Sequence, residues 1–401
     1  MILASQLLAL VALFTPLNSC STKDNPQLDK AKIYTVSDAR ASERDSSDDG
    51  VTSSRRNAIT RAVAKASPAV VGINVTEIRE QRVYDPFDGF GFDDPFFRQF
   101  FGNQRRGPTT QKYKVEGLGS GFIISPDGYI LTNDHVAGNA SKIIVTTTGG
   151  KQFDAKLIAT DPVGDVALVK IDAEDLPYLK LGNSEDLAIG EWAIAMGNPF
   201  GLFRTNDKPT VTVGVISNTG VNLGLEQGKN YRGMIQTDAA ISSGNSGGPL
   251  LNANGEVIGI NAVIRSTAQS YEGAGSIGLG FAIPINKVKT IVEDFRSGKK
   301  VNRNFGSLGF IWQTFDAEMK QYVNVQADEG CVITNIYRNS LATEAGLQVG
   351  DVIIALDGEH VRSQEDLSSI IADRKVGDIV TFTVLRSEGK MQIKMKLPQG
   401  K

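Results

Sequence analysis

Cysteine and histidine are both scarce in this chain, with two of each among 401 residues. The two cysteines, Cys20 and Cys331, are too few for a disulfide framework. With only two histidines and with scattered acidic residues, we expect no metal site, and nothing in the chain implies an organic cofactor. If the chain uses a histidine as a catalytic base, that base is either His135 or His360.

Clusters of positive charge are also missing. Lysine and arginine number 42 against 45 aspartates and glutamates, and the net charge is −3. The basic residues are scattered, so nucleic acid is not expected as a partner. The length predicts two or three domains, and abundant glycine without a period is typical of a β-rich protein with many tight turns.

The N-terminus carries an apolar stretch, residues 7–14, that is too short to cross a bilayer as a mature helix. It predicts an export signal. Residues 17–20 (LNSC) resemble the lipobox of bacterial lipoproteins, so we expect residues 1–20 to be a lipoprotein-type signal peptide, with Cys20 lipidated and anchoring the chain in a membrane. The alternative is an ordinary signal peptide with an incidental cysteine, because no lysine or arginine precedes the apolar stretch.

Residues 21–56 are polar and contain serine–aspartate runs, which predict a disordered tether. Beyond a short helix capped by Asn57, short apolar runs recur around turn residues at 126–128, 149–150 and 254–255. This spacing predicts a β-sandwich or β-barrel domain over residues 57–298. A helix capped by Asn286 closes that segment. Residues 303–400 alternate short strands with two helices and predict a separate α+β module.

Residues 244–250 (GNSGGPL) surround Ser246 with glycines, which let a hydroxyl and nearby backbone N–H groups approach a substrate carbonyl. His135 and Asp165 precede this serine, and the order His–Asp–Ser is that of chymotrypsin-type proteases. An α/β-hydrolase arrangement with His360 as base is formally available. That arrangement requires a helix directly after the serine, whereas residues 249–260 predict a turn followed by a strand.

Several motifs together resemble the HtrA/Deg family of serine proteases, and the C-terminal module resembles a PDZ domain. The motifs are residues 132–136 (TNDHV), 164–168 (GDVAL), 236–241 (QTDAAI), 244–250 (GNSGGPL) and 278–284 (GLGFAIP), with 306–310 (GSLGF) and 345–353 (AGLQVGDVI) in the C-terminal module. The resemblance implies a mainly β fold: a chymotrypsin-like double six-stranded β-barrel followed by an α+β PDZ domain. Asp134 and the pair Ser242–Ser243 differ from the residues more common at these positions in the family, but no catalytic group is lost.

The resemblance also implies roles for individual residues. Ser246 would be the nucleophile, His135 the base and Asp165 the group that orients it. The oxyanion hole would be formed at Gly244, Asn245 and Ser246, and a small apolar substrate pocket by Ala240, Ile241, Ile277 and Leu279. A peptide C-terminus would bind the PDZ groove at Gly306, Ser307, Leu308, Gly309, Phe310, Ile311 and Ile371.

The implied function is degradation of misfolded or damaged proteins in the bacterial periplasm or cell envelope by a homotrimer. Two alternatives remain from sequence: a regulatory protease that cuts one dedicated substrate, and a mainly chaperone or scaffold role. The phenylalanine-rich segment 85–101 is expected to dock, either on its own domain or on another subunit, because so much apolar surface is costly to leave in water.

Overall fold

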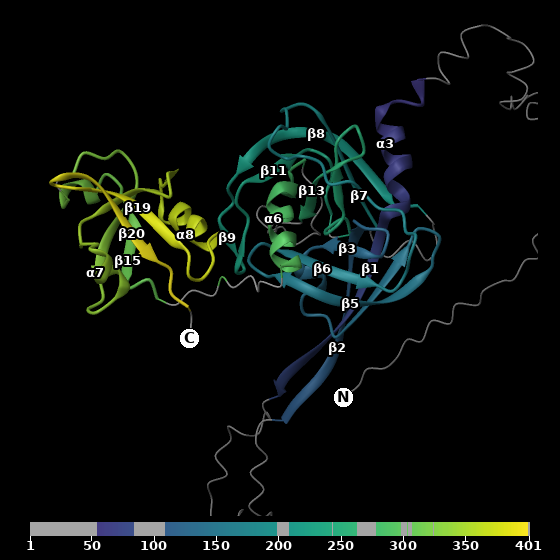
Figure 1. The fold of residues 1–401 in the computed structure, drawn as a ribbon, viewed down its shortest axis with the longest axis horizontal. Coiled ribbons are helices and arrows are strands. Elements are labelled where there is room, and N and C mark those ends of the chain that lie inside the picture. The colour runs from purple at the N-terminus through teal and green to yellow at the C-terminus, as the bar shows by residue number, and fades with distance from the viewer. Residues whose placement is uncertain are drawn as a thin grey trace, which may run out of the picture. The chain divides into compact units, whose positions relative to one another are not determined.

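The computed structural model describes residues 54–83, 109–198, 208–242, 244–262, 278–297, 303, 307–323 and 325–399, with the backbone alone for 79–83 and 109–113. The predicted signal peptide with Cys20, nearly all of the tether and the phenylalanine-rich segment lie outside these residues, as do Ile277 and Gly306. Within the described ranges, no helix is long and apolar enough to cross a membrane. The fold is mainly β, as predicted, and consists of two closed six-stranded barrels followed by an α+β module (Figure 1).

The first barrel closes in the order β1-β2-β3-β6-β5-β4. Its strands are β1 Val70–Val83, β2 Thr109–Ile123, β3 Tyr129–Thr132, β4 Lys142–Thr147, β5 Gln152–Asp161 and β6 Val166–Ile171. The hairpins predicted around residues 126–128 and 149–150 are confirmed, because β2 pairs with β3 and β4 pairs with β5. Gly128 adopts a φ of +99°, and a Cβ at this position would lie 2.6 Å from the carbonyl oxygen of Ile171.

The second barrel closes in the order β11-β14-β13-β12-β7-β8. Its strands are β7 Trp192–Gly197, β8 Thr210–Val221, β11 Met234–Thr237, β12 Pro249–Leu251, β13 Val257–Ala262 and β14 Gly280–Pro284. The third predicted hairpin, around residues 254–255, is confirmed by the pairing of β12 with β13. Two short strands, β9 Leu225–Glu226 and β10 Lys229–Asn230, form a separate hairpin between β8 and β11.

Two longer helices flank the barrels in the sequence. Helix α3, Ala58–Ala66, is capped as predicted by Asn57, whose side chain accepts a hydrogen bond from the Thr60 N–H. The predicted cap of helix α6, Ile285–Arg296, was wrong. The helix begins directly after Pro284, and the Asn286 side chain instead donates to Asn183 Oδ1 at 2.6 Å. A tertiary partner for the asparagine therefore replaced the local capping interaction.

The C-terminal module contains a sheet in the order β15-β16-β17-β19-β20, with β18 paired to β17. Its strands are β15 Phe310–Thr314, β16 Cys331–Ile336, β17 Val352–Leu356, β18 Glu359–His360, β19 Ile379–Arg386 and β20 Gly389–Lys396. Its two helices are α7 Leu341–Ala345 and α8 Gln364–Ala372, with the short 3₁₀ turn η3 Met319–Gln321. Ser340 caps α7 and Ser363 caps α8. Strand β15 lies at the edge of this sheet, and within the described part of the chain no strand pairs with its outer side, where a further strand could add.

Cys331 lies in the core of this module and is fully buried. Burial, reinforced by the charges of Asp366 and Glu365, raises the pKa of its thiol to about 12. The reactive thiolate is therefore scarce at neutral pH. In a Cys20→Ser protein at pH 8, we expect Ellman's reagent to label Cys331 slowly in the folded state and rapidly after unfolding in guanidinium. Equal labelling rates in the two states would contradict the buried placement.

Candidate active site

Neighbouring strands of the first barrel carry two of the predicted catalytic residues to the same end. Strands β3 and β6 are paired, with Thr132 opposite Ala167. The chain continues from β3 into the short helix α5, Asp134–Ala137, which carries His135, whereas Asp165 immediately precedes β6. Pairing therefore places a segment that follows one strand beside a segment that precedes the other.

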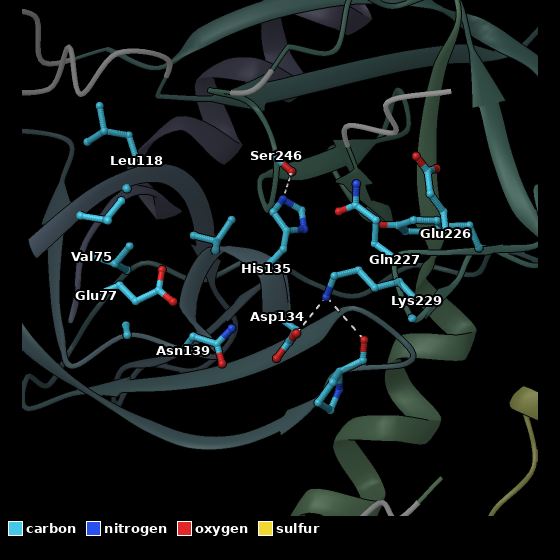
Figure 2. A pocket seen from close by; sticks show the side chains of 17 residues that line it. Val75, Glu77, Leu118, Asp134, His135, Asn139, Glu226, Gln227, Lys229 and Ser246 are labelled. Carbon is cyan, nitrogen blue, oxygen red and sulfur yellow. Dashed lines mark hydrogen bonds and ion pairs between the residues drawn. The ribbon is translucent and has the colours of Figure 1, made fainter. Parts of the chain in front are cut away.

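His135 lies between the other two predicted catalytic side chains. Its Nε2 is 2.8 Å from Ser246 Oγ, and its Nδ1 is 2.8 Å from Asp165 Oδ2 (Figure 2 shows the contact with Ser246). The backbone N–H of His135 also donates to Asp165 Oδ1 at 3.0 Å. Asp165 is fully buried, whereas the His135 side chain is 33% exposed. This is the geometry in which a histidine takes a proton from a serine while a carboxylate holds the ring.

Asp165 has an unusual backbone conformation. Its φ is +56°, in the left-handed region that aspartate tolerates better than most residues. The side chain of Asn133 donates from Nδ2 to the Asp165 carbonyl oxygen at 2.9 Å and accepts from Ser246 Oγ at its own Oδ1. Asn133 thereby links the aspartate backbone to the serine hydroxyl.

Two further side chains hydrogen-bond to the Asp165 carboxylate. Lys229 Nζ lies 2.9 Å from Oδ1, and the Tyr231 hydroxyl donates to Oδ2 at 3.1 Å. Burial alone would raise the pKa of Asp165, but the hydrogen bonds and charges of His135 and Lys229 hold it below its ordinary value. Burial, followed by the charge of Asp165, raises the pKa of Tyr231 above its ordinary value. The phenol therefore remains a hydrogen-bond donor and the carboxylate remains ionised at neutral pH.

Close packing requires a glycine directly after Ser246. Gly247 has a φ of +83°, and a Cβ there would lie 2.3 Å from both the Ser120 carbonyl oxygen and Thr132 Oγ1. The Ser120 N–H donates to the Ser246 carbonyl oxygen at 2.9 Å. The Asn245 N–H donates to the Ser242 carbonyl oxygen at 2.9 Å, so Asn245 serves the turn itself. A larger residue at position 247 would push the nucleophile turn away from β2 and β3.

A cavity of about 950 Å³ opens beside Ser246 and His135. One side of it is formed by Val75 and Glu77 from β1 and Leu118 from β2, and the opposite side is formed by the β9–β10 hairpin (Figure 2). An extended substrate segment that reached Ser246 would therefore pass between strands β1 and β2 on one side and the β9–β10 hairpin on the other.

Of the residues expected to form the substrate pocket, the three that the structure describes do not line this cavity. Ile241 is 7% exposed and packs in the core of the second barrel. Ala240 and Leu279 are exposed, and the Ala240 carbonyl oxygen accepts a hydrogen bond from Thr212 Oγ1 at 2.7 Å. The remaining predicted pocket residue, Ile277, is outside the described residues.

The predicted PDZ groove residues that the structure describes lie directly before β15, at the start of β15 and on α8. Leu308, Phe310 and Ile371 are buried in one apolar cluster, whereas Ile311 is 40% exposed on the edge strand. The Gly309 N–H donates to Ser307 Oγ at 3.2 Å. That internal bond engages one of the backbone donors expected to meet a peptide carboxylate.

His360 is not brought to Ser246. It lies on β18 in the C-terminal module, its side chain is 61% exposed, and its Nδ1 is 3.4 Å from Glu329 Oε1. Strand β12 begins at Pro249, three residues after Ser246, where an α/β-hydrolase would have a helix. The geometry therefore favours His135 over His360 as the partner of the serine.

Comparison with known proteins agrees with this architecture. The trypsin-like peptidase domain matches residues 119–260, and the PDZ domain matches residues 332–386. A protein of Chlamydia trachomatis serovar D named "Probable periplasmic serine endoprotease DegP-like" is 40% identical over 351 residues, which cover 85% of this chain and 68% of the relative. The chain belongs to the HtrA/Deg family of serine proteases. It is a serine endopeptidase.

A second relative and a solved structure support the same family assignment. A Pseudomonas fluorescens protein of the same name is 39% identical over 343 residues, covering 84% of this chain and 69% of the relative. Among solved structures, "HtrA-type protease AlgW with decapeptide" superposes with a TM-score of 0.62 at 34% identity, covering 85% of this chain and 98% of the other.

Three residues of this HtrA/Deg protease that contact the site were not predicted from sequence: Asn133, Lys229 and Tyr231. Asn133 stands two residues before His135 and could have been noticed by proximity. Lys229 lies 95 residues from Asp134, with which it also pairs, and no spacing rule connects such positions. Only the closure of the barrels and the β9–β10 hairpin brings them together.

Proposed function

We propose that this endopeptidase cleaves peptide bonds through an acyl-enzyme formed on Ser246. His135 takes the serine proton and later delivers it to the leaving amine, while Asp165 holds the imidazole and stabilises its charged form. The hydrogen-bonded row Asp165–His135–Ser246, with both linking distances at 2.8 Å, carries this proposal. Loss of proteolysis in a Ser246→Ala protein that still folds is the test.

The backbone N–H groups of Gly244 and Ser246 are the oxyanion donors in this mechanism, because the Asn245 N–H is used within the turn. For specificity, Ala240 stands six residues before the nucleophile, where trypsin-like relatives carry an acidic residue. Leu279 is expected to line the same pocket, so the proposed pocket is small and apolar. Cleavage is expected after aliphatic residues such as Val, Ala or Ile.

The proposed biological role is degradation of misfolded or damaged proteins in the periplasm or cell envelope. The relatives named as periplasmic endoproteases support this placement. The proposal includes a homotrimer, a lipid anchor at Cys20, and domain limits of 57–298 for the protease and 303–400 for the PDZ domain. A Ser246→Ala trap followed by proteomics separates the roles: many unfolded clients support quality control, whereas one client supports a dedicated regulatory protease.

The PDZ domain is proposed to bind peptide C-termini. An added peptide strand would pair with the outer edge of β15, and its last side chain would meet the apolar cluster that includes Leu308 and Ile371. We expect a peptide ending in valine to bind about 10- to 100-fold more tightly than the same peptide with a C-terminal amide, because a hydrogen-bonded charge is lost. Fluorescence anisotropy with Ser246→Ala protein measures both affinities. Equal affinities would exclude carboxylate recognition at residues 307–309.

A further inference from the structure

Lys229 places a buried positive charge beside the triad of Asp165, His135 and Ser246. The mechanism proposed for the triad does not use this charge. Its Nζ lies 2.9 Å from Asp165 Oδ1 and 2.8 Å from Asp134 Oδ2, and its side chain is 16% exposed. Burial alone would lower the pKa of Lys229, but the two carboxylates hold it above its ordinary value. The ammonium group is therefore charged at neutral pH and below. Figure 2 shows it extending from the β9–β10 hairpin toward Asp134.

The ammonium group and a protonated His135 compete for the same carboxylate. Asp165 Oδ1 accepts from the His135 backbone N–H and from Lys229, and Oδ2 accepts from Tyr231 while facing His135 Nδ1. A cation that neutralises part of the carboxylate charge weakens the attraction that would hold an extra proton on the imidazole. Lys229 also repels a positively charged ring directly.

Other charged and titratable groups contact His135 or line the same cavity. They are Asp134 on α5, Asp165 before β6, Glu77 on β1, Glu226 on β9, Lys229 on β10 and Tyr231 beyond it. The acidic members of this set favour a protonated ring. Among the described residues that line the cavity, Lys229 is the only basic side chain besides His135 itself, so it is the group that opposes them.

We propose that Lys229 is a positioning residue that keeps His135 neutral, and the protease active, at lower pH than the Ser246–His135–Asp165 row alone would permit. Asp134 holds the ammonium group at the carboxylate through its own ion pair, and Thr160 holds Asp134 through a hydrogen bond. The inference rests on the proposed roles of these three catalytic residues. The proposal assigns a function to Asp134, one of the positions where this chain differs from the residue more common in the family.

The first test is the pH profile of kcat/KM on a fluorogenic peptide. In Lys229→Met, we expect the acid limb to move upward by about 0.5–1 pH unit, because a nearby unit charge has been removed. Activity near pH 5.5 should then fall about 3- to 10-fold relative to wild type, with a smaller change on the alkaline plateau. Lys229→Arg keeps the charge and should keep the wild-type limb.

Two further variants serve as controls for the interpretation of this pH profile. Lys142→Met removes the same charge from an exposed ion pair with Asp154 and should leave the profile unchanged. Lys229→Gln still offers a hydrogen bond to the buried Asp134 and should show the shift even if Lys229→Met does not fold. A uniform loss of activity at every pH, with the acid limb unmoved, would assign Lys229 a structural role alone and overturn the proposal.

A second test observes the histidine directly by proton NMR. In a Ser246→Ala/His360→Ala background the chain retains a single histidine, so the ring signal of His135 needs no further assignment. We expect this signal to titrate at higher pH when Lys229 is replaced by Met or Gln than when Lys229 is present. Identical midpoints would overturn the inference while leaving the proposed catalytic roles intact, because those depend on the activity lost in Ser246→Ala.

Discussion

Replacing Ser246 by alanine should abolish cleavage of casein while leaving the fold intact. Loss of a catalytic serine typically costs on the order of a millionfold in turnover, because no acyl-enzyme can form. The substitution removes one hydroxyl that is bonded to His135 and Asn133, and it leaves the glycine turn unchanged. Release of dye from labelled casein measures the activity, and near-ultraviolet circular dichroism reports the packing of the barrels.

His360→Ala is the matched control for this experiment. It removes the chain's other histidine, an exposed side chain on β18 of the PDZ domain, and should leave turnover unchanged. Residual casein cleavage by the Ser246→Ala protein, once contaminating proteases are excluded with an affinity-matched blank, would refute Ser246 as nucleophile. An equal loss of activity in His360→Ala would instead revive the α/β-hydrolase arrangement.

Much of the architecture was predictable because local signals and global packing agree. The turn at residues 126–128 needs a left-handed glycine, and a glycine stands there between two apolar runs. The serine turn at 244–250 combines glycines with a proline that starts a strand, and this pattern by itself favours a barrel protease over an α/β-hydrolase. With two histidines in the chain, the number of candidate bases was small.

The rest depended on contacts that no local pattern encodes. Asn286 has the residue type of a helix cap, yet its amide is committed to Asn183, more than one hundred residues away. Ile241 has the apolar character expected of a substrate pocket, but it faces the core of the second barrel. In the sequence, Lys229 has the pattern of an ordinary hairpin lysine. Barrel closure places its side chain between two buried carboxylates. Each case is a long-range contact that decides among locally acceptable roles.

Asp165→Asn should reduce kcat by about 10⁴-fold, the loss known for the equivalent change in the chymotrypsin-type template, while preserving the shape of the site. Asparagine tolerates the left-handed backbone at φ +56° as aspartate does, so the loop before β6 should keep its conformation. Its amide, however, carries no charge to stabilise an imidazolium. It also presents a donor that can hold His135 in the wrong tautomer.

The same substitution should change the dependence of stability on pH. The pKa of Asp165 is depressed in the folded protein, so its contribution to stability is present above the pKa of the unfolded chain and is lost as pH falls through the lower folded value. Without this carboxylate, the melting temperature of Asp165→Asn should decline less steeply between pH 5 and pH 3 than that of wild type. Scanning calorimetry over this range measures the two slopes.

A folded Asp165→Asn protein with near-wild-type kcat would refute the orienting role, and parallel slopes would refute the depressed pKa. Asp165→Ala, which loses both the charge and the tolerance for the left-handed backbone, should be the less stable of the two variants.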